Sequence, residues 1–335
     1  MTGNSLLWAV CACGLIVLVA EPLTIALLRR LAVLDVPGER SSHAVPTPRG
    51  GGAPIAAGLL VAAALAPGGP FAWQGRLALA LAVGFFGLLG LVDDLRGLPA
   101  ISRLVLQVAG AVVVGTVLAS PLPLPAPLRA TAIAVVAAWL VGFVNAFNFM
   151  DGVNGIAGAH ALIGGVAYAC LAGWRRDGFG VASGLALAVG AGAFLPFNAV
   201  RARVFLGDVG SYSIGAALAV LAARLLSLGV PVEAVAGPVA LCLTDVAWTL
   251  ARRIRRGEPW LEAHRTHVYQ RWCDVGWTHP EVTVLTCALT VLLCLLGLAS
   301  VLGGTATRVA ADLAGLGALA IYLRSPRLFT RVREA

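Results

Sequence analysis

The sequence predicts an all-α, polytopic integral membrane protein, and three observations support that fold class. Of the 335 residues, 59% are hydrophobic and only 12% are charged, whereas soluble domains are roughly 45–50% apolar. The mean hydropathy is +0.89. Apolar runs of about 16–23 residues recur along the chain, and each is long enough, or nearly so, to cross roughly 30 Å of hydrocarbon. We expect about eleven transmembrane helices, with ten as the alternative, in a single domain over residues 1–335.

The first expected span, 6–28, has no basic segment before it and is longer than the apolar part of a cleaved signal peptide. We therefore expect it to remain as a helix. Proline and glycine separate later runs, as at 66–70 and 121–127, because neither residue readily continues a helix. The other expected spans are 52–67, 76–92, 104–120, 129–146, 156–173, 179–197, 212–228, 233–251, 281–303 and 309–324.

The charged residues predict how the helices are oriented. All 24 cationic residues are arginines, and the net charge is +8. Eighteen arginines lie in one set of alternate loops and five in the other, with Arg224 inside a span. Because loops rich in arginine stay in the cytoplasm, we expect a periplasmic N-terminus and a cytoplasmic C-terminus. The charge then reflects topology and not nucleic-acid binding, since no basic helix is interleaved with aromatic residues.

The cysteines predict neither a disulfide framework nor a metal site. Six of the seven fall inside apolar spans, and Cys273 lies in a basic loop. Five segments on the predicted inner side are instead unusually polar, and these are expected to form the site. They are 29–51, 93–103, 145–155, 198–211 and 252–280.

Two adjacent carboxylates, Asp93 and Asp94, are expected at the inner end of the third span. Burial and mutual repulsion make such a pair costly unless a cation relieves it. A solvated helix end with Arg96 as partner is the alternative. Because the chain contains few acids, the abutting pair favours a cation-binding role.

The next polar segment places Asn148, Asp151 and Asn154 at three-residue spacing, which puts them on one face of a helical turn. Gly152 and Gly155 would let a phosphate approach closely. A helix cap and turn would explain Asp151 but not the two amides. The spacing therefore favours a polar site.

A third carboxylate, Asp208, is expected at the start of the eighth span, beside Gly207 and Gly210. It would serve as a plain helix N-cap. Alternatively, backbone N–H groups at this helix start meet a phosphate while the acid holds the bridging metal. The segment alone does not decide between these readings.

The long basic loop contains His264, Arg265, His267 and Arg271. A zinc pair is one interpretation, but no cysteine or His-Glu-x-x-His signature accompanies the histidines. Binding of phosphate or of a leaving group is preferred, and a solvated amphipathic loop is the alternative.

The first inner loop, 35–52, combines turn formers and hydroxyls with His43 and Arg49. It would cradle an anionic head group, or it would be an ordinary loop that is basic for reasons of orientation alone. Taken together, the five segments offer acids for a divalent cation and bases for phosphates beside a bilayer. Such a site joins a phosphorylated donor to a lipid acceptor.

With these residues in view, the chain resembles the polyprenyl-phosphate N-acetylhexosamine-1-phosphate transferase family, also called glycosyltransferase family 4. Five segments carry the resemblance in order along nearly the whole chain. They are the 37–52 loop, Asp93-Asp94, Asn148-Phe149-Met150-Asp151-Gly152-Val153-Asn154-Gly155, Phe205-Leu206-Gly207-Asp208-Val209-Gly210-Ser211 and His264-Arg265-Thr266-His267-Val268-Tyr269-Gln270-Arg271.

The resemblance implies a Mg²⁺-dependent enzyme, with Mn²⁺ as a substitute, in the bacterial inner membrane with its site facing the cytoplasm. It would transfer an N-acetylated hexosamine or 6-deoxyhexosamine 1-phosphate from a UDP-sugar to undecaprenyl phosphate. The products are undecaprenyl-diphosphate-sugar and UMP, and no covalent enzyme intermediate is needed. The lipid bilayer is its other partner, a homodimer is a further arrangement to test, and no nucleic acid is expected.

The form of the basic loop, with Asp245 about twenty residues upstream, most resembles the branch that begins O-antigen units with N-acetylated 6-deoxyhexosamines such as N-acetylfucosamine. The peptidoglycan branch usually has a third aspartate after the pair, where Gly97 stands here, and three consecutive histidines. Its donor-binding lysines have no counterpart, so Arg49, Arg96, Arg103 or His43 would substitute. A UDP-GlcNAc:undecaprenyl-phosphate transferase and a phospho-MurNAc-pentapeptide transferase stay as alternatives.

The family pattern implies a role for each matching residue. The catalytic residues are Asp93, Asp94, Asp151, Asp208, His264 and His267. The substrate-binding residues are His43, Arg49, Asn148, Asn154, Arg265, Arg271 and Arg103. The metal ligands are Asp208, Asp94, Asp151 and Asn154.

Two rival classes fit the sequence less well. A transporter would carry charges near the bilayer midplane, but only Glu21, Arg224 and Asp245 are candidates there. An intramembrane serine protease would use a hydroxyl of segment 210–213. It would lack a base, because His160, the one histidine inside a span, is expected to be structural.

Overall fold

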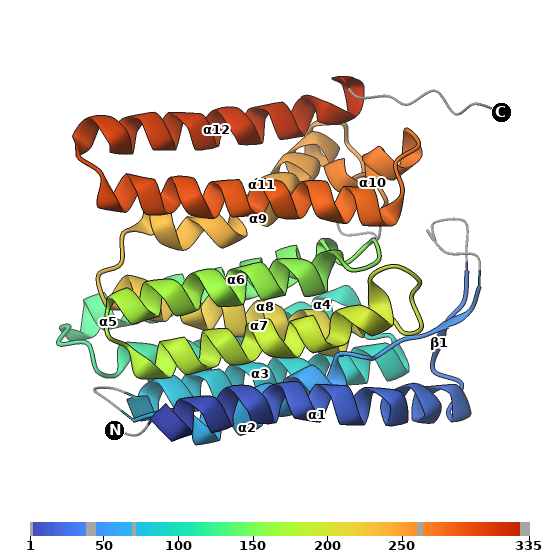
Figure 1. The fold of residues 1–335 in the computed structure, drawn as a ribbon, viewed down its shortest axis with the longest axis horizontal. Coiled ribbons are helices and arrows are strands. Elements are labelled where there is room, and N and C mark those ends of the chain that lie inside the picture. The colour runs from blue at the N-terminus through green and yellow to red at the C-terminus, as the bar shows by residue number, and fades with distance from the viewer. Residues whose placement is uncertain (1–2, 38–44, 69–71, 260–263, 329–335) are drawn as a thin grey trace.

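The computed structural model describes residues 3–37, 45–68, 72–259 and 264–328. Within these ranges the chain forms twelve α-helices and one antiparallel sheet of two strands. The long helices run alternately in opposite directions through one bundle (Figure 1). Ten helices of the described part are long and apolar enough to cross a membrane. The predicted fold class, an all-α polytopic membrane protein, is thereby confirmed.

The elements of the first half are α1 (Gly3–Arg30), β1 (Leu34–Asp35), β2 (Thr47–Pro48), α2 (Ala53–Leu65), α3 (Ala72–Arg96), α4 (Ala100–Ala119) and α5 (Ala126–Phe149). Those of the second half are α6 (Ile156–Trp174), α7 (Gly178–Asn198), α8 (Gly207–Ser227), α9 (Val232–Arg255), α10 (Val268–Asp274), α11 (His279–Leu302) and α12 (Thr305–Leu328). All eleven expected spans therefore coincide with helices.

Two helices differ from the expected pattern. Helix α2 has 13 residues, a length of about 20 Å against roughly 30 Å of hydrocarbon. It ends before Pro67, which cannot supply the N–H group that a continuing helix needs. Helix α10 was not expected as a separate element, because its seven residues lie within the basic loop 252–280. It lies at the same end of the bundle as β1 (Figure 1).

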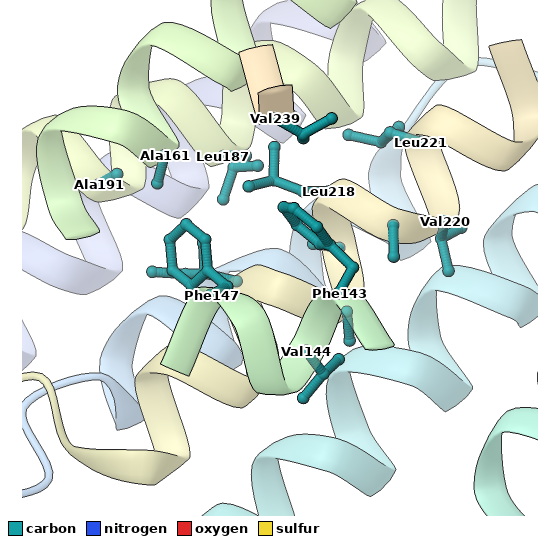
Figure 2. Packing of buried hydrophobic residues seen from close by; sticks show 14 of the residues in the cluster. Phe143, Val144, Phe147, Ala161, Leu187, Ala191, Leu218, Val220, Leu221 and Val239 are labelled. Carbon is teal, nitrogen blue, oxygen red and sulfur yellow. The ribbon is translucent and has the colours of Figure 1, made fainter. Parts of the chain in front are cut away.

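Helix α8 is the centre of the bundle. In its most apolar stretch 89% of the residues are buried, against 11% for α12. Small residues such as Gly215, Ala216 and Ala219 are fully or nearly fully covered, and they let neighbouring helices approach closely. Phe143 and Phe147 of α5 pack beside this helix near Leu218 (Figure 2).

The first inner loop is tied to the loop before α8. Arg49 forms an isolated parallel bridge with Phe205. The Phe205 N–H donates to the carbonyl of Pro48 at 2.8 Å, and the Gly51 N–H donates to the carbonyl of Phe205 at 2.9 Å. Two segments about 155 residues apart in sequence are thus held together at one end of the bundle.

Candidate active site

The site is built around the N-terminus of α8. The carboxylate of Asp94, at the end of α3, accepts the backbone N–H of Asp208 at 2.9 Å and that of Val209 at 3.0 Å. It therefore caps a helix other than its own, where the helix dipole favours a negative charge. Gly90 makes this possible, because a Cβ there would lie 2.2 Å from the carbonyl oxygen of Asp208.

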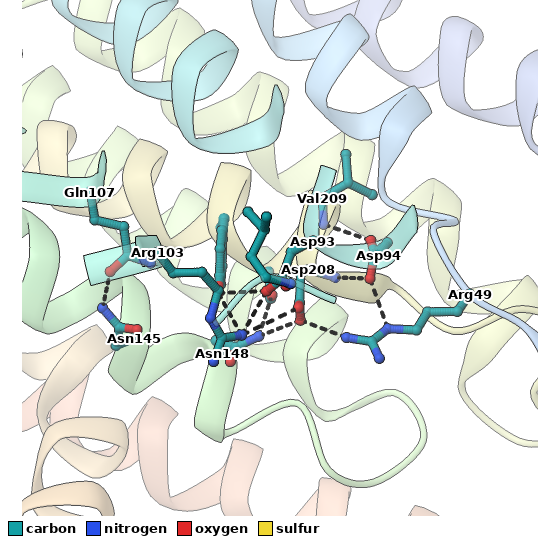
Figure 3. A network of polar contacts seen from close by, with 12 residues as sticks. Arg49, Asp93, Asp94, Arg103, Gln107, Asn145, Asn148, Asp208 and Val209 are labelled. Carbon is teal, nitrogen blue, oxygen red and sulfur yellow. Dashed lines mark hydrogen bonds and ion pairs between the residues drawn. The ribbon is translucent and has the colours of Figure 1, made fainter. Parts of the chain in front are cut away.

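Arg49 joins two of the predicted carboxylates. Its Nε lies 2.7 Å from Oδ1 of Asp94, and its Nη2 lies 2.9 Å from Oδ1 of Asp208 (Figure 3). Burial lowers the pKa of Arg49, but the carboxylates of Asp208 and Asp94 outweigh it and raise that pKa above its ordinary value. Arg49 is therefore a permanent cation in the site.

A second arginine holds the remaining member of the Asp pair. Nη1 of Arg103 lies 2.6 Å from Oδ2 of Asp93 and 4.0 Å from Oδ2 of Asp208. The backbone N–H of Leu98 donates to Oδ1 of Asp93 at 2.7 Å, and the hydroxyl of Tyr212 donates to its Oδ2 at 3.4 Å. Both oxygens of Asp93 are therefore engaged.

The polar turn after α5 completes the cluster. Nδ2 of Asn148 donates to Oδ1 of Asp208 at 2.8 Å and to the hydroxyl of Ser211 at 2.9 Å. Among the described residues, the Asp151 carboxylate has no hydrogen-bond or ion-pair partner. Burial, and next the nearby charge of Asp208, raise the pKa of Asp151 to about 7. We call Asp93, Asp94, Asp151 and Asp208 the acid cluster.

Two cavities meet at the acid cluster. The polar cavity, of about 320 Å³, includes Asn154, Asn198 and Arg265 in its wall. The apolar cavity, of about 570 Å³, is walled by residues from α4, α5 and α9, such as Leu104 and Leu250. Six residues belong to both walls: Arg49, Asn148, Asp151, Gly152, Asp208 and Gln270. A ligand in either cavity would therefore contact the same carboxylates.

The histidine loop, residues 264–271, borders the apolar cavity. Nδ1 of His267 lies 3.0 Å from Oδ1 of Asp245, a fully buried carboxylate in α9. Asp245 also accepts the N–H groups of Val268 at 3.1 Å and Tyr269 at 3.3 Å, and the hydroxyl of Tyr322 at 2.6 Å. With Nδ1 directed at this carboxylate, Nε2 is the nitrogen left for a ligand.

His264 stacks on His267, with ring centroids 5.0 Å apart. Burial, and next the neighbouring His267 and Arg253, lower the pKa of His264 to about 4. At neutral pH it is therefore an uncharged imidazole, which can bind a phosphate by a hydrogen bond but adds no positive charge.

The remaining predicted residues are placed as follows. Arg265 lines the polar cavity and lies 3.5 Å from Asp274, while Arg271 lines neither cavity. Asn154 lines the polar cavity, and its carbonyl accepts the hydroxyl of Thr283 at 2.9 Å. His43 lies outside the described residues. Their roles stay predictions.

Residues 76–226 match the family described as Glycosyl transferase family 4. A decaprenyl-phosphate N-acetylglucosaminephosphotransferase of Mycobacterium leprae (strain TN) is 29% identical over 296 residues, which cover 77% of this chain and 74% of the relative. A probable undecaprenyl-phosphate N-acetylglucosaminyl 1-phosphate transferase of Bacillus subtilis (strain 168) is 29% identical over 279 residues, which cover 79% and 76%. A phospho-N-acetylmuramoyl-pentapeptide-transferase of Streptococcus mutans serotype c is 31% identical over 209 residues, which cover 56% and 61%.

These matches support membership of glycosyl transferase family 4. The matched region runs from α3 into α8 and contains the whole acid cluster together with Arg103 and Asn148. The histidine loop and Arg49 lie outside that region.

The donor atoms of the site suit Mg²⁺ when the substrate supplies the remaining ligands. The four carboxylates and the guanidinium groups of Arg49 and Arg103 leave a net charge of −2 when all are ionised. Among the described residues, no three His, Cys, Asp or Glu side chains form a ready-made cation site. Mg²⁺ commonly uses one or two carboxylates, water and substrate phosphates. Asp151 and Asp208 line both cavities, whereas both oxygens of Asp94 are already engaged.

The structure also brings in residues that the sequence did not single out. The sequence places Asp245 within a span and about twenty residues before the basic loop, but its link to His267 depends on tertiary packing. Tyr212 contacts Asp93, and Gln107 pairs with Asn145 in the wall of the apolar cavity. The one available signal was that glutamine and asparagine are rare in apolar spans.

Proposed function

We propose that this chain transfers an N-acetylated hexosamine 1-phosphate from a UDP-sugar to a polyprenyl phosphate, releasing UMP. The observation that carries the proposal is the meeting of a polar and an apolar cavity at one acid cluster. A nucleotide-sugar needs polar walls, and a prenyl chain needs apolar walls open to the bilayer. The names of the matched relatives state polyprenyl-phosphate acceptors.

The proposed reaction is a single displacement at phosphorus. An oxygen of the lipid phosphate forms a bond to the sugar-bearing phosphorus, the bond from that phosphorus to the bridging oxygen breaks, and UMP leaves with that oxygen. Arg49 and Arg103 would bind phosphate oxygens and replace the family lysines, because they are the cationic candidates seen against the carboxylates.

The four carboxylates would have two kinds of role, metal binding and positioning of neighbouring groups. Asp151 and Asp208 would hold Mg²⁺, or Mn²⁺, since both line the two cavities and Asp151 has no other partner among the described residues. The bound metal would neutralise phosphate charge and orient donor and acceptor. Asp94 would fix the start of α8, and Asp93 would hold Arg103 in place.

The transferred sugar is proposed from the histidine loop. Its sequence favours an N-acetylated 6-deoxyhexosamine and a role at the start of O-antigen synthesis. The relatives named above act on N-acetylglucosamine or on phospho-N-acetylmuramoyl-pentapeptide. These sugars are therefore the competitors to be tested.

The proposed location is the bacterial inner membrane, with the acid cluster at the cytoplasmic end of the bundle. The arginine distribution supports it, because β1, α10 and the arginine-rich loops share one end of the bundle (Figure 1). Labelling of single cysteines placed at Arg201 and at Arg129 in intact cells would test the orientation. Labelling of the Arg201 position from outside would contradict it.

The test of the reaction is UMP release by the purified chain in detergent with undecaprenyl phosphate and Mg²⁺. The donors are UDP-GlcNAc, UDP-N-acetylfucosamine and UDP-MurNAc-pentapeptide, each assayed with and without the acceptor lipid. We expect acceptor-dependent UMP release that Asp208→Ala lowers on the order of 10³-fold. Solute flux in proteoliposomes without UMP release from any donor would favour a transporter and overturn the proposal.

A further inference from the structure

A pair of buried amides lies in the wall of the apolar cavity, apart from the acid cluster. Gln107 of α4 and Asn145 of α5 both line this cavity, and Gln107 is 1% exposed. Nδ2 of Asn145 donates to Oε1 of Gln107 at 2.6 Å (Figure 3). Nε2 of Gln107 is buried and has no hydrogen-bond partner in the part of the chain that the structure describes. Buried amide N–H groups are rarely left unpaired, so this one needs an acceptor.

The orientation of the pair is fixed by the backbone. Nδ2 of Asn145 also donates to the carbonyl of Val141 at 2.8 Å, and a carbonyl can only accept. The NH₂ group of Asn145 must therefore face Val141 and Gln107. Gln107 must in turn present its oxygen to Asn145, because two NH₂ groups cannot bond to each other. The free group of Gln107 is consequently a donor.

The position of Gln107 indicates which part of a ligand it meets. Gln107 follows Arg103 by four residues on α4, so both side chains lie on one face, about 6 Å apart along the axis. Asn145 precedes Asn148 by three residues on α5 in the same way. Arg103 and Asn148 reach the acid cluster. The amide pair therefore lies about one helical turn from side chains that reach the acid cluster, in the wall of the same apolar cavity.

We propose that Gln107, oriented by Asn145, donates a hydrogen bond to a phosphate oxygen of the prenyl phosphate acceptor. This inference rests on the proposed function, in which the apolar cavity takes the acceptor. The contact makes the cavity selective for a prenyl phosphate over the corresponding alcohol, since only the phosphate offers an anionic acceptor. The donor sugar, bound from the polar cavity, does not use it.

The experiment measures binding and kinetics separately. Purified chain is titrated with farnesyl phosphate and with farnesol without a UDP-sugar, and binding is followed as thermal stabilisation. We expect Gln107→Met, which keeps the length of the side chain, to weaken farnesyl phosphate binding about tenfold, the loss typical of one hydrogen bond to a charged group. Farnesol binding should stay within twofold of the unmodified chain.

Turnover gives the second readout. Gln107→Met should raise the KM for the acceptor about tenfold and leave the KM for the UDP-sugar unchanged. Asn145→Ala removes the group that orients Gln107 and should act in the same direction, by a smaller factor. Gln74→Leu is the matched control. Gln74 of α3 is also buried and has an oxygen without a hydrogen-bond partner among the described residues, but it lines neither cavity. It should change neither KM.

Several outcomes would overturn the inference. They are unchanged farnesyl phosphate binding in both variants, equal weakening of phosphate and alcohol, or a rise confined to the KM of the UDP-sugar. If the unmodified chain binds farnesyl phosphate in preference to farnesol but transfers no sugar phosphate, the proposed function fails while the binding role of Gln107 is still decided by the titrations.

Discussion

Two buried ionic groups at different places in the bundle show what separates a structural ion pair from a site. Arg224 near the end of α8 and Asp177 before α7 form a two-point pair, with Nε to Oδ2 at 2.7 Å and Nη2 to Oδ1 at 2.9 Å. Each side chain is 7% exposed, and Arg224 also lies over Phe179. The single positive charge of Arg224 balances the single negative charge of Asp177, and both carboxylate oxygens accept a hydrogen bond from the guanidinium group.

The acid cluster at the other end of α8 is unbalanced by comparison. Four carboxylates face two arginines, and Asp151 has no partner among the described residues. Folding alone would not favour this surplus, because buried charges are stable only when they are paired. The surplus negative charge is therefore consistent with the proposed role of a bound cation at the acid cluster.

The largest expected effect is at the centre of the unbalanced cluster. Asp208→Ala should lower kcat/KM for sugar-phosphate transfer on the order of 10³-fold, since it removes a carboxylate shared by both cavities. The measurement is acceptor-dependent UMP release, with the thermal unfolding midpoint as the control for folding. Near-normal transfer would mean that the cluster is not the reaction centre.

A smaller loss of transfer activity is expected from changes at Asp245, which contacts the histidine loop. Asp245→Asn keeps the size of the side chain but removes the charge that faces Nδ1 of His267, so transfer should fall roughly 10–100-fold. Tyr322→Phe, which removes one hydrogen bond to the same carboxylate, should cost less. Steady-state rates of the two variants test this order, and the reverse order would contradict it.

The pH dependence of Mg²⁺ binding tests whether Asp151, the carboxylate of the acid cluster without a partner among the described residues, is a metal ligand. With a pKa of about 7, Asp151 is mostly protonated at pH 6 and mostly ionised at pH 8. Because Mg²⁺ competes with the proton, its affinity should rise as pH increases through 7, by at most tenfold per unit below the pKa. Thermal stabilisation by Mg²⁺ at both pH values measures this. Asp151→Asn should reduce the pH dependence, and an unchanged dependence would exclude Asp151 as a ligand.

The smallest effect on specific activity should come from the balanced pair. Arg224→Met leaves Asp177 buried without its main partner and should cost about 3–5 kcal/mol of stability. Transfer per folded molecule should stay normal. The double variant Arg224→Met with Asp177→Asn should regain part of the lost stability in thermal unfolding. A loss of specific activity at an unchanged unfolding midpoint would give this pair a role in the reaction.

Much of this architecture can be predicted from the sequence, because a segment that crosses hydrocarbon must pair its backbone polar groups internally and therefore forms a helix. Every expected apolar run is a helix, and the segments around Asp93, Asn148 and Asp208 meet as predicted from their shared side of the membrane. Helix α2 shows the limit of this reasoning, because composition marks a run as apolar but does not say whether it is long enough to span.

The individual hydrogen bonds between distant segments could not be predicted from the sequence. Asp94 can cap α8 because α3 approaches it closely at Gly90. The presence of an aspartate and a glycine in the sequence does not predict this contact. The sequence places Asp245 about twenty residues before the basic loop, but it does not show that this carboxylate contacts His267 of that loop and Tyr322 of α12. Hydrogen bonds of this kind depend on packing, which periodicity does not encode.

Helix α12 gives the histidine loop an unusual attachment. Most of the helix faces outward, yet Tyr322 donates to Asp245, and Ser325 accepts the indole N–H of Trp272 at 2.7 Å. A helix that is longer than the local hydrocarbon layer tilts, and a tilt of α12 would move these two anchors. Through Asp245, the orientation of His267 therefore depends on where α12, a peripheral helix, lies against the bundle.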